Sequence, residues 1–240
     1  MIMGQNGLIF LGLAVVVFVI ANAVAVQRRK ARKEQTESFA SLQGFRNEGD
    51  ANPFLGVDVK RPVMEGGARL GGLKVGRAPI VPQMLIDLAV GRGTVRNVLR
   101  GPTVAGEVIL FDYRSPVAGS NSESGQIFST LAAFRVPGIP EFQLAPRARF
   151  TFAMELIDFP ANARFSKRFM LMANDEPAVR RVFAPAVLLA CEALMEKRDW
   201  YLQAGSGSLL VTFGRMRPEE LPDLVEQSAR VAAAMQKTTA

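Results

Sequence analysis

The clearest pattern in the chain is an unbroken apolar stretch from Gly7 to Val26, which contains one amide, Asn22, and no charged residue. Twenty helical residues rise about 30 Å, which matches the hydrocarbon core of a bilayer. Because backbone polar groups find no water there, a single apolar span must be helical. The pattern therefore predicts a transmembrane helix over 7–26, preceded by a short external N-terminus over 1–6.

The charges around this stretch predict its orientation. No charged residue precedes the span, whereas five cations follow it: Arg28, Arg29, Lys30, Arg32 and Lys33. By the positive-inside rule the N-terminus lies outside and the remaining chain is cytoplasmic. A cleaved signal peptide is the alternative, since Ala21-Asn22-Ala23 fits a cleavage pattern. Signal peptides, however, have a charged start and a shorter apolar core. We therefore expect an uncleaved anchor.

Alternating apolar and polar residues predict strands beyond residue 100. VAGEVILFDY at 104–113 predicts a buried strand, and QIFSTLAAFRV at 126–136 predicts its antiparallel partner across the polar loop 114–125. The segments 200–204 and 209–213 predict a hairpin that turns at Gly205–Ser208. Two further segments have the strand pattern, 140–144 and 164–173.

Three segments have the period of an amphipathic helix. The first covers 82–91 and the last covers 218–236. The middle segment covers 177–195, with Asp175 as its expected N-cap and with Pro185 expected to kink or split it.

The order of these elements predicts an α+β fold, because the strands come in runs without regular βαβ alternation. We expect an antiparallel sheet of about five to seven strands, with the 177–195 and 218–236 helices packed on one face. The predicted organisation after the anchor is a basic juxtamembrane segment and linker over 27–61, a cytoplasmic domain over 62–237 and a tail over 238–240.

The formal net charge of +7 is concentrated near the anchor. Residues 1–33 hold five cations and no acid, which leaves 24 Lys and Arg against 22 Asp and Glu in the rest of the chain. A juxtamembrane cluster of this kind attracts the anionic inner leaflet, by about 1 kcal/mol per cation. The lipid bilayer is therefore a predicted partner. The rest of the chain has too small an excess of positive charge to predict binding to nucleic acid.

A second group of cations follows the 82–91 helix. Arg92, Arg96 and Arg100 recur at intervals of four, so they would line one face if this segment were helical. One interpretation is that this face rests on the anionic leaflet beside the anchor; the other is an ordinary solvated face. Membrane-surface contact is predicted for eight cations in all: Arg28, Arg29, Lys30, Arg32, Lys33, Arg92, Arg96 and Arg100.

Candidate chemistry is sparse. The chain has no histidine, which excludes catalytic triads, general bases and metal sites that use a histidine side chain. Its single cysteine, Cys191, lies in an apolar run, where a buried hydrophobe is one interpretation and a reactive thiol the other. The Gly66-Gly67 and Gly71-Gly72 pairs lack the Gly-Lys-Ser/Thr of a phosphate loop. No cofactor or metal site is predicted.

A few polar and aromatic residues remain as candidates for a site. Asp112 with Tyr113, Asp158, and Asn174-Asp175-Glu176 could supply a pair of carboxylates for acid–base work, although caps and turns explain them equally. Trp200-Tyr201 is either an interface or stacking pair or half-buried packing. The Gly205–Ser208 segment is either an anion nest or a plain turn. No catalytic residue is predicted.

The motifs taken together resemble a known family. The order FDY, a polar loop, QIFSTLAAF, PEFQL, RFSKRFMLMANDE, a helix and GSLLVTFGRM is similar to a family of bacterial membrane-tethered proteins with a domain of unknown function. The similarity covers roughly Val104 to Met216 and the layout of the anchor. It implies a bacterial inner-membrane location and carries no catalytic residues.

Three classes of function follow as hypotheses. The leading hypothesis is a non-enzymatic interaction or scaffolding module with a protein partner at the membrane. The alternative is a membrane-tethered binding module for an apolar or lipid-like ligand, held in a cavity between sheet and helices. An enzyme that uses carboxylates ranks third, and would require a pocket that encloses two of Asp112, Asp158 and Asp175.

Overall fold

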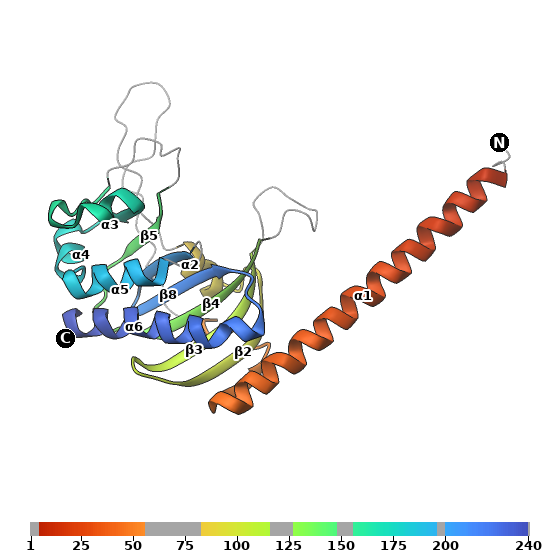
Figure 1. Cartoon of the computed structure of the whole chain (residues 1–240), viewed down its shortest axis with the longest axis horizontal. Coiled ribbons are helices and arrows are strands. Elements are labelled where there is room, and N and C mark those ends of the chain that lie inside the picture. Colours follow the sequence, from red (N-terminus) through yellow and green to blue (C-terminus); the bar gives the residue numbers. More distant parts are fainter. Residues whose placement is uncertain (1–4, 56–82, 116–126, 148–155, 196–199, 240) are drawn as a thin grey trace, which may run out of the picture.

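A computed structural model describes residues 5–55, 83–115, 127–147, 156–195 and 200–239; the side chains of residues 5–17, Arg29, Ile127 and Met195 lie outside that description. A single long helix, α1 (Gln5–Gln43), runs away from a domain built of a sheet and shorter helices. Only its C-terminal end meets the domain (Figure 1).

The sheet has eight strands in the order β1-β2-β3-β4-β8-β7-β5-β6, and every neighbouring pair is antiparallel. The prediction of an antiparallel sheet with helices is confirmed, although the strand number exceeds the expected range. The strands are β1 (Arg46–Gly49), β2 (Thr94–Thr103), β3 (Gly106–Ser115), β4 (Ile127–Arg135), β5 (Phe142–Pro146), β6 (Phe169–Ala173), β7 (Trp200–Gly205) and β8 (Ser208–Gly214).

The helices near the C-terminus follow the signals in the sequence. Asp175 caps α4 by accepting a hydrogen bond from the backbone N–H of Ala178 at 2.9 Å. A break before Pro185 separates α4 from α5, as predicted. The helical elements after α1 are α2 (Gln83–Ala89), η2 (Pro160–Asn162), α3 (Ala163–Arg168), α4 (Glu176–Val182), α5 (Pro185–Met195), η3 (Pro218–Glu220) and α6 (Leu221–Thr239).

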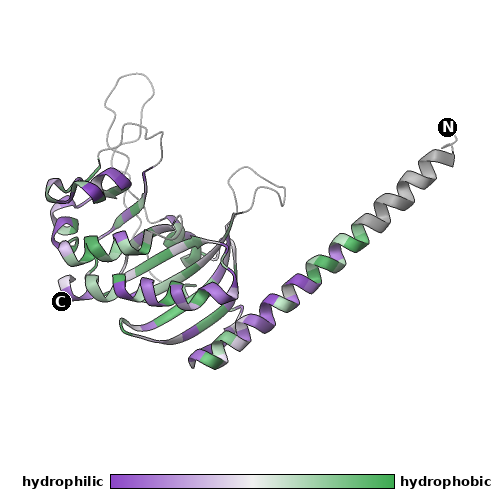
Figure 2. Cartoon of the chain, in the orientation of Figure 1, coloured by the Kyte–Doolittle hydropathy of each residue, from purple (hydrophilic) through white to green (hydrophobic). Residues whose placement is uncertain are grey.

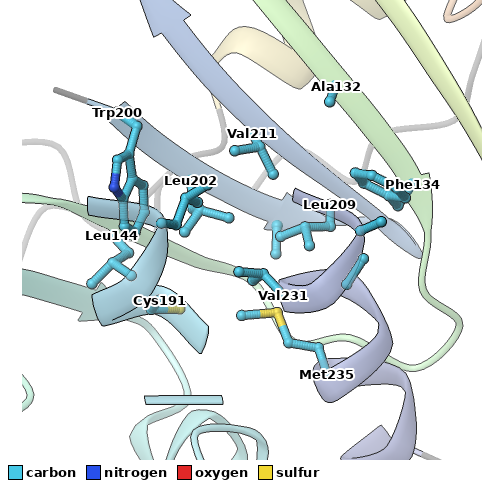
Figure 3. Close-up of a cluster of buried hydrophobic side chains, with 14 of the residues drawn as sticks. Ala132, Phe134, Leu144, Cys191, Trp200, Leu202, Leu209, Val211, Val231 and Met235 are labelled. Atoms are coloured by element: carbon cyan, nitrogen blue, oxygen red, sulfur yellow. The ribbon is translucent and has the colours of Figure 1, made fainter. Parts of the chain in front are cut away.

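The main core lies between one face of the sheet and helices α4, α5 and α6. Side chains from the strands, such as Leu202 and Leu209, interdigitate with Cys191 of α5 and Met235 of α6 (Figure 3). All four are completely buried. The described side chains of this layer pack against one another and form the main hydrophobic core of the domain.

The opposite face of the sheet is also covered. Leu85 and Leu88 of α2 pack there with Phe54 against Phe111 and Leu210. The expectation that helices pack on one face therefore holds for α4 to α6, while α2 adds a smaller layer on the other face.

One predicted strand is half helical. Residues 163–168 form α3, and only 169–173 form β6. Asn162 caps α3 by accepting from the backbone N–H of Phe165 at 3.1 Å. Phe165 and Phe169, four residues apart, are buried together with ring centroids 4.9 Å apart. Their spacing therefore reflects a short helix before the strand.

Part of the predicted linker belongs to the folded domain. α1 ends where Gly44 takes a φ of +69°, and the Phe45 N–H bonds to the Ala40 carbonyl at 2.8 Å. This is the Schellman arrangement, and the Phe39 and Phe45 rings complete it with their centroids 5.4 Å apart. Strand β1 then pairs with β2. The folded unit thus begins before the expected boundary at residue 62.

The predicted span lies in the projecting part of α1. Along that helix hydrophobic residues give way to hydrophilic ones toward the domain (Figure 2). Within the described part of the chain, none of the helices is both long and apolar enough for a membrane span. Residues 7–17 of the predicted 7–26 span have side chains outside that description.

Candidate functional site: a basic cleft between α1 and the sheet

An open cleft of about 710 Å³ lies where α1 leaves the sheet. One wall is a single face of α1, with Ala21, Val24, Ala25, Arg28 and Arg32 at intervals of three and four residues. The other wall comes from the ends of β2, β3 and β4 and from the segment after β8. The cleft therefore contains both the end of the predicted span and the first cations after it.

Asp112 fixes α1 at the inner end of this cleft. Its carboxylate receives two hydrogen bonds from the Arg32 guanidinium, at 2.7 and 2.9 Å. Thr130 donates to the same carboxylate at 3.0 Å and Asn97 donates at 2.8 Å. Arg32 also donates to the Met216 carbonyl at 2.5 Å. Three other segments of the chain therefore bond to this carboxylate and a fourth bonds to Arg32, which makes the ion pair a structural joint.

Packing continues along the same face of α1 toward its C-terminus. Thr36, Phe39 and Ala40 are buried against the domain. The Phe45 ring lies over Gly101 of β2, where a Cβ atom would come within 2.6 Å of Cγ of the ring. Because Gly101 has no side chain, the Phe45 ring can approach β2 this closely. These contacts and the buried residues of α1 fix the C-terminal end of the helix to the domain.

The charge of the cleft is strongly positive. Two carboxylates line it, Asp50 and Asp112, against six cations: Arg28, Arg32, Lys33, Arg96, Arg114 and Arg215. Asp50 accepts a hydrogen bond from the backbone N–H of Asn97 at 3.0 Å, and Asp112 is bonded to Arg32. An anion is therefore the species that the cleft attracts.

Phe128 adds an aromatic surface to the cationic wall. Its side chain is 46% exposed and stands in the cleft. The Arg114 guanidinium lies 5.5 Å from the ring centroid and that of Arg215 lies 5.6 Å from it. Both cations are thus in cation–π contact with a partly exposed ring.

The sequence did not indicate Phe128, Arg114 or Arg215 as site residues. Arg114 and Phe128 face each other across β3 and β4, while Arg215 follows β8. Strand pairing brings them together, and no local spacing in the sequence could have predicted this.

The eight predicted membrane-contact cations have different surroundings. Arg32 and Arg100 are bound within the fold, Arg100 to Glu48 at 3.0 Å and to Glu107 at 2.7 Å. Hydrogen bonding to Arg100 holds the Glu48 pKa below its usual range. Weaker pairs join Arg92 to Asp87 at 3.7 Å and Lys33 to Glu37 at 3.9 Å. Among the described residues no ion pair is made by Arg28, Lys30 or Arg96.

Arg92, Arg96 and Arg100 do not share one face. Arg92 precedes β2, while Arg96 and Arg100 lie within it, so the condition for a helical stripe is not met. The register shifts between Arg96 and Leu99, and Asn97 takes a φ of 52°. Arg96 therefore pairs with Asp112 and Arg100 with Ile109, on opposite faces of the sheet. Only Arg96 lines the cleft.

The candidate carboxylates are not gathered into one site. Asp112 lines the cleft, whereas Asp158 is exposed before η2 and Asp175 caps α4. Tyr113 is buried and its hydroxyl donates to the Arg92 carbonyl at 2.8 Å. The described part of the chain contains no cluster of acidic and cysteine side chains able to hold a metal ion. A carboxylate-based enzyme stays an untested hypothesis.

The remaining candidates have structural roles. Cys191 is fully buried, and burial raises the pKa of its thiol well above the usual value. Trp200 is 2% exposed and packs near Phe169 in the core. Ser206 and Gly207 both take positive φ in the turn between β7 and β8, which is the geometry of a tight hairpin.

Comparison with known proteins identifies a similar fold. No family model matches this sequence, and no curated protein matches it either. The crystal structure of the mycobacterial trehalose monomycolate transport factor A, TtfA, matches with a TM-score of 0.50 and 13% sequence identity. The match covers 86% of this chain and 93% of that chain. At this identity the similarity concerns the fold alone.

Proposed function

We propose that this protein is a single-pass membrane protein whose domain binds a lipid-like molecule in the cleft between α1 and the sheet. The observation that carries the proposal is the composition of the cleft wall on α1. Ala21, Val24 and Ala25 belong to the predicted span, while Arg28 and Arg32 belong to the juxtamembrane cluster. A molecule that fills the cleft meets an apolar end and a cationic end, which is the polarity of a lipid.

Two further observations support this function. The layer between the sheet and helices α5 and α6 is filled with side chains, so the open cleft is the better candidate for the ligand. A similar fold belongs to a protein named for the transport of trehalose monomycolate, which is itself a lipid. For this chain we propose only the same class of ligand, a lipid.

The membrane setting is part of the same proposal. We propose that 7–26 spans the bacterial inner membrane, with the N-terminus outside and the domain in the cytoplasm. The basis is the charge asymmetry around the span and the resemblance to membrane-tethered bacterial proteins. In this arrangement the open end of the cleft lies at the inner surface of the bilayer.

A second function, as an interaction module, rests on the projecting part of α1. Phe18, Val19 and Ile20 are 70%, 57% and 57% exposed, and this end of the helix stands clear of the domain (Figure 1). Such side chains need lipid or the helix of a partner protein to cover them. We propose a partner at the membrane whose chemistry the chain does not specify.

Native mass spectrometry of the full-length protein, extracted from its membrane in mild detergent, tests the lipid-binding function. We expect a bound, lipid-sized mass that survives gentle ionisation. A bare protein mass at every detergent condition would reject this function and favour the interaction module.

Two matched variants locate the ligand. Ala25→Phe places a ring inside the cleft, whereas Ala23→Phe places the same ring on an exposed position of α1 outside it. We expect the first variant to lose the bound mass and the second to keep it. Equal retention by both would place the ligand elsewhere.

A further inference from the structure

Resting on the lipid-binding function proposed above, we infer that the cleft selects a phospholipid with a net negative head group. Phosphatidylglycerol has this chemistry, and Arg28, Arg96 and Arg215 would hold its phosphate. The zwitterionic head groups of phosphatidylcholine and phosphatidylethanolamine carry an ammonium group that the cationic wall repels.

Three cations of the cleft have no counter-charge among the described residues. Arg32 is neutralised by Asp112, and Lys33 lies 3.9 Å from Glu37. In the described part of the chain neither Arg28, Arg96 nor Arg215 forms an ion pair, although all three line the cleft. Each is exposed at its surface. They come from three different segments, so only the folded chain concentrates them.

The carboxylates of the cleft do not offset these cations. Asp112 is engaged by Arg32, Thr130 and Asn97. Asp50 accepts from the backbone N–H of Asn97 and adds one negative charge, which is fewer than the three positive charges of Arg28, Arg96 and Arg215. A net negative ligand is therefore needed to balance the wall. Guanidinium groups also form paired hydrogen bonds with phosphate oxygens, which favours phosphate as the negative group.

The orientation of the ligand follows from the order of residues on α1. From Ala21 to Arg32 the cleft face rises about 16 Å and changes from apolar to cationic. The acyl chains would lie beside Ala21, Val24 and Ala25, and the head group beside Arg28. This order matches the bilayer, since the apolar end of the face belongs to the predicted span. A soluble anion would use only the cationic half.

Phe128 supports a ligand at the membrane surface. Its exposed ring lies 5.6 Å from the Arg215 guanidinium, which presents an apolar surface and a cation side by side. At a bilayer interface an aromatic ring can contact the acyl chains of a lipid while an arginine beside it contacts the head group.

The test uses the full-length protein in nanodiscs of equal phosphatidylglycerol and phosphatidylcholine, with the retained lipid identified by native mass spectrometry. We expect phosphatidylglycerol to be enriched in the retained lipid. Removing one contributing cation, as in Arg28→Gln, Arg96→Gln or Arg215→Gln, should lower that enrichment about fivefold.

Lys30→Gln is the matched control. Lys30 belongs to the same juxtamembrane cluster but lies on α1 outside the cleft. We expect it to retain the enrichment of the unmodified protein. If Lys30→Gln lowers the enrichment as much as Arg28→Gln, diffuse attraction to the cluster explains the preference and the proposed site is wrong.

The remaining outcomes separate the two proposals. Retention of both lipids in equal amounts would overturn the head-group selectivity while lipid binding stands. Retention of neither lipid would overturn lipid binding itself. Displacement of the retained lipid by soluble glycerol phosphate would overturn the lipid assignment in favour of a soluble anion, whereas we expect no displacement.

Discussion

Asp112 joins the long helix to the sheet. Its side chain is 21% exposed and that of Arg32 is 13% exposed, so water screens their ion pair only in part. The two parallel hydrogen bonds fix the direction of the guanidinium as well as its position. We therefore expect a larger coupling energy between Arg32 and Asp112 than between the partners of an exposed ion pair.

A double-mutant cycle of Asp112→Ala and Arg32→Ala measures this contribution. We expect Asp112→Ala to lower the free energy of unfolding by about 2 kcal/mol, because Arg32, Asn97 and Thr130 each lose an acceptor. Chemical denaturation gives the values, and the two substitutions should be clearly non-additive.

The control cycle uses Glu226 and Arg230, an i,i+4 pair on α6 whose side chains are 61% and 66% exposed. Its coupling energy should stay below about 0.5 kcal/mol. Equal coupling in both cycles would mean that the pair at Asp112 has no special role in docking α1.

The sequence contains two tyrosines, Tyr113 and Tyr201, whose ionisation links the free energy of unfolding to pH. Burial raises the pKa of Tyr113 to about 12, with the nearby Asp87 adding to the effect. Burial likewise raises the pKa of Tyr201 to about 12. In the unfolded chain both phenols ionise near pH 10.

These shifts predict an alkaline loss of stability. The contribution of the two phenols is complete below about pH 10 and falls as the pH rises toward about 12, because the unfolded chain releases its protons first. Ultraviolet titration of phenolate should show neither tyrosine ionising near pH 10 while the protein stays folded. A normal titration near pH 10 under native conditions would contradict the burial of both rings.

At the scale of elements, the contact between α1 and β2 depends on one glycine. Gly101 has no Cβ, and an added Cβ would lie 2.6 to 2.8 Å from three atoms of the Phe45 ring. Since Phe45 also closes the C-terminal motif of α1, displacing its ring should loosen the end of that helix.

Gly101→Ala should therefore lower the free energy of unfolding by about 1 to 3 kcal/mol through overpacking. Gly214→Ala is the control, because it also changes a strand glycine and its Cβ would meet nothing within 4 Å. Thermal unfolding followed by circular dichroism distinguishes them. If the two variants melt together, Phe45 adapts at little cost.

At the scale of the whole molecule, α1 consists of two parts with different surroundings. The part up to residue 26 projects from the domain, and the part from Arg32 to Ala40 packs on it. Removing the first part alone should leave the domain folded with its joint to Asp112 intact.

Truncation before residue 27 and truncation before residue 44 test this division. The longer truncation also removes Phe39, which is 7% exposed, and a loss of this kind costs about 3 to 5 kcal/mol. We expect a cooperative thermal transition for the shorter truncation and a much lower melting temperature for the longer one. Equal melting temperatures would mean that α1 contributes nothing to the stability of the domain.

Much of the fold could be predicted from local patterns. The β3–β4 and β7–β8 hairpins, the Asp175 cap and the break at Pro185 lie where the residues indicate. Errors arose where a local pattern fits two structures. The spacing of Phe165 and Phe169 suits a strand as well as a helix. The stripe of Arg92, Arg96 and Arg100 was conditional on a helix, and Arg96 and Arg100 lie in β2 on either side of a register shift.

The candidate site was predicted only in part. Arg28, Arg32, Lys33 and Arg96 were named as cations that would meet the membrane, and all four line the cleft. Asp112 was named for acid–base chemistry, whereas it binds Arg32. Its partner lies far away along the chain, so no spacing rule applies to the pair.

The sequence by itself determined the apolar stretch, the cationic cluster after it and the period of most strands and helices, because these depend on neighbouring residues. The tertiary structure alone decided which face of α1 meets the sheet and which of the described cations have no counter-charge among the described residues. Those properties depend on the pairing of segments distant in sequence, where packing and ion pairing select one arrangement. The cleft exists only in that arrangement.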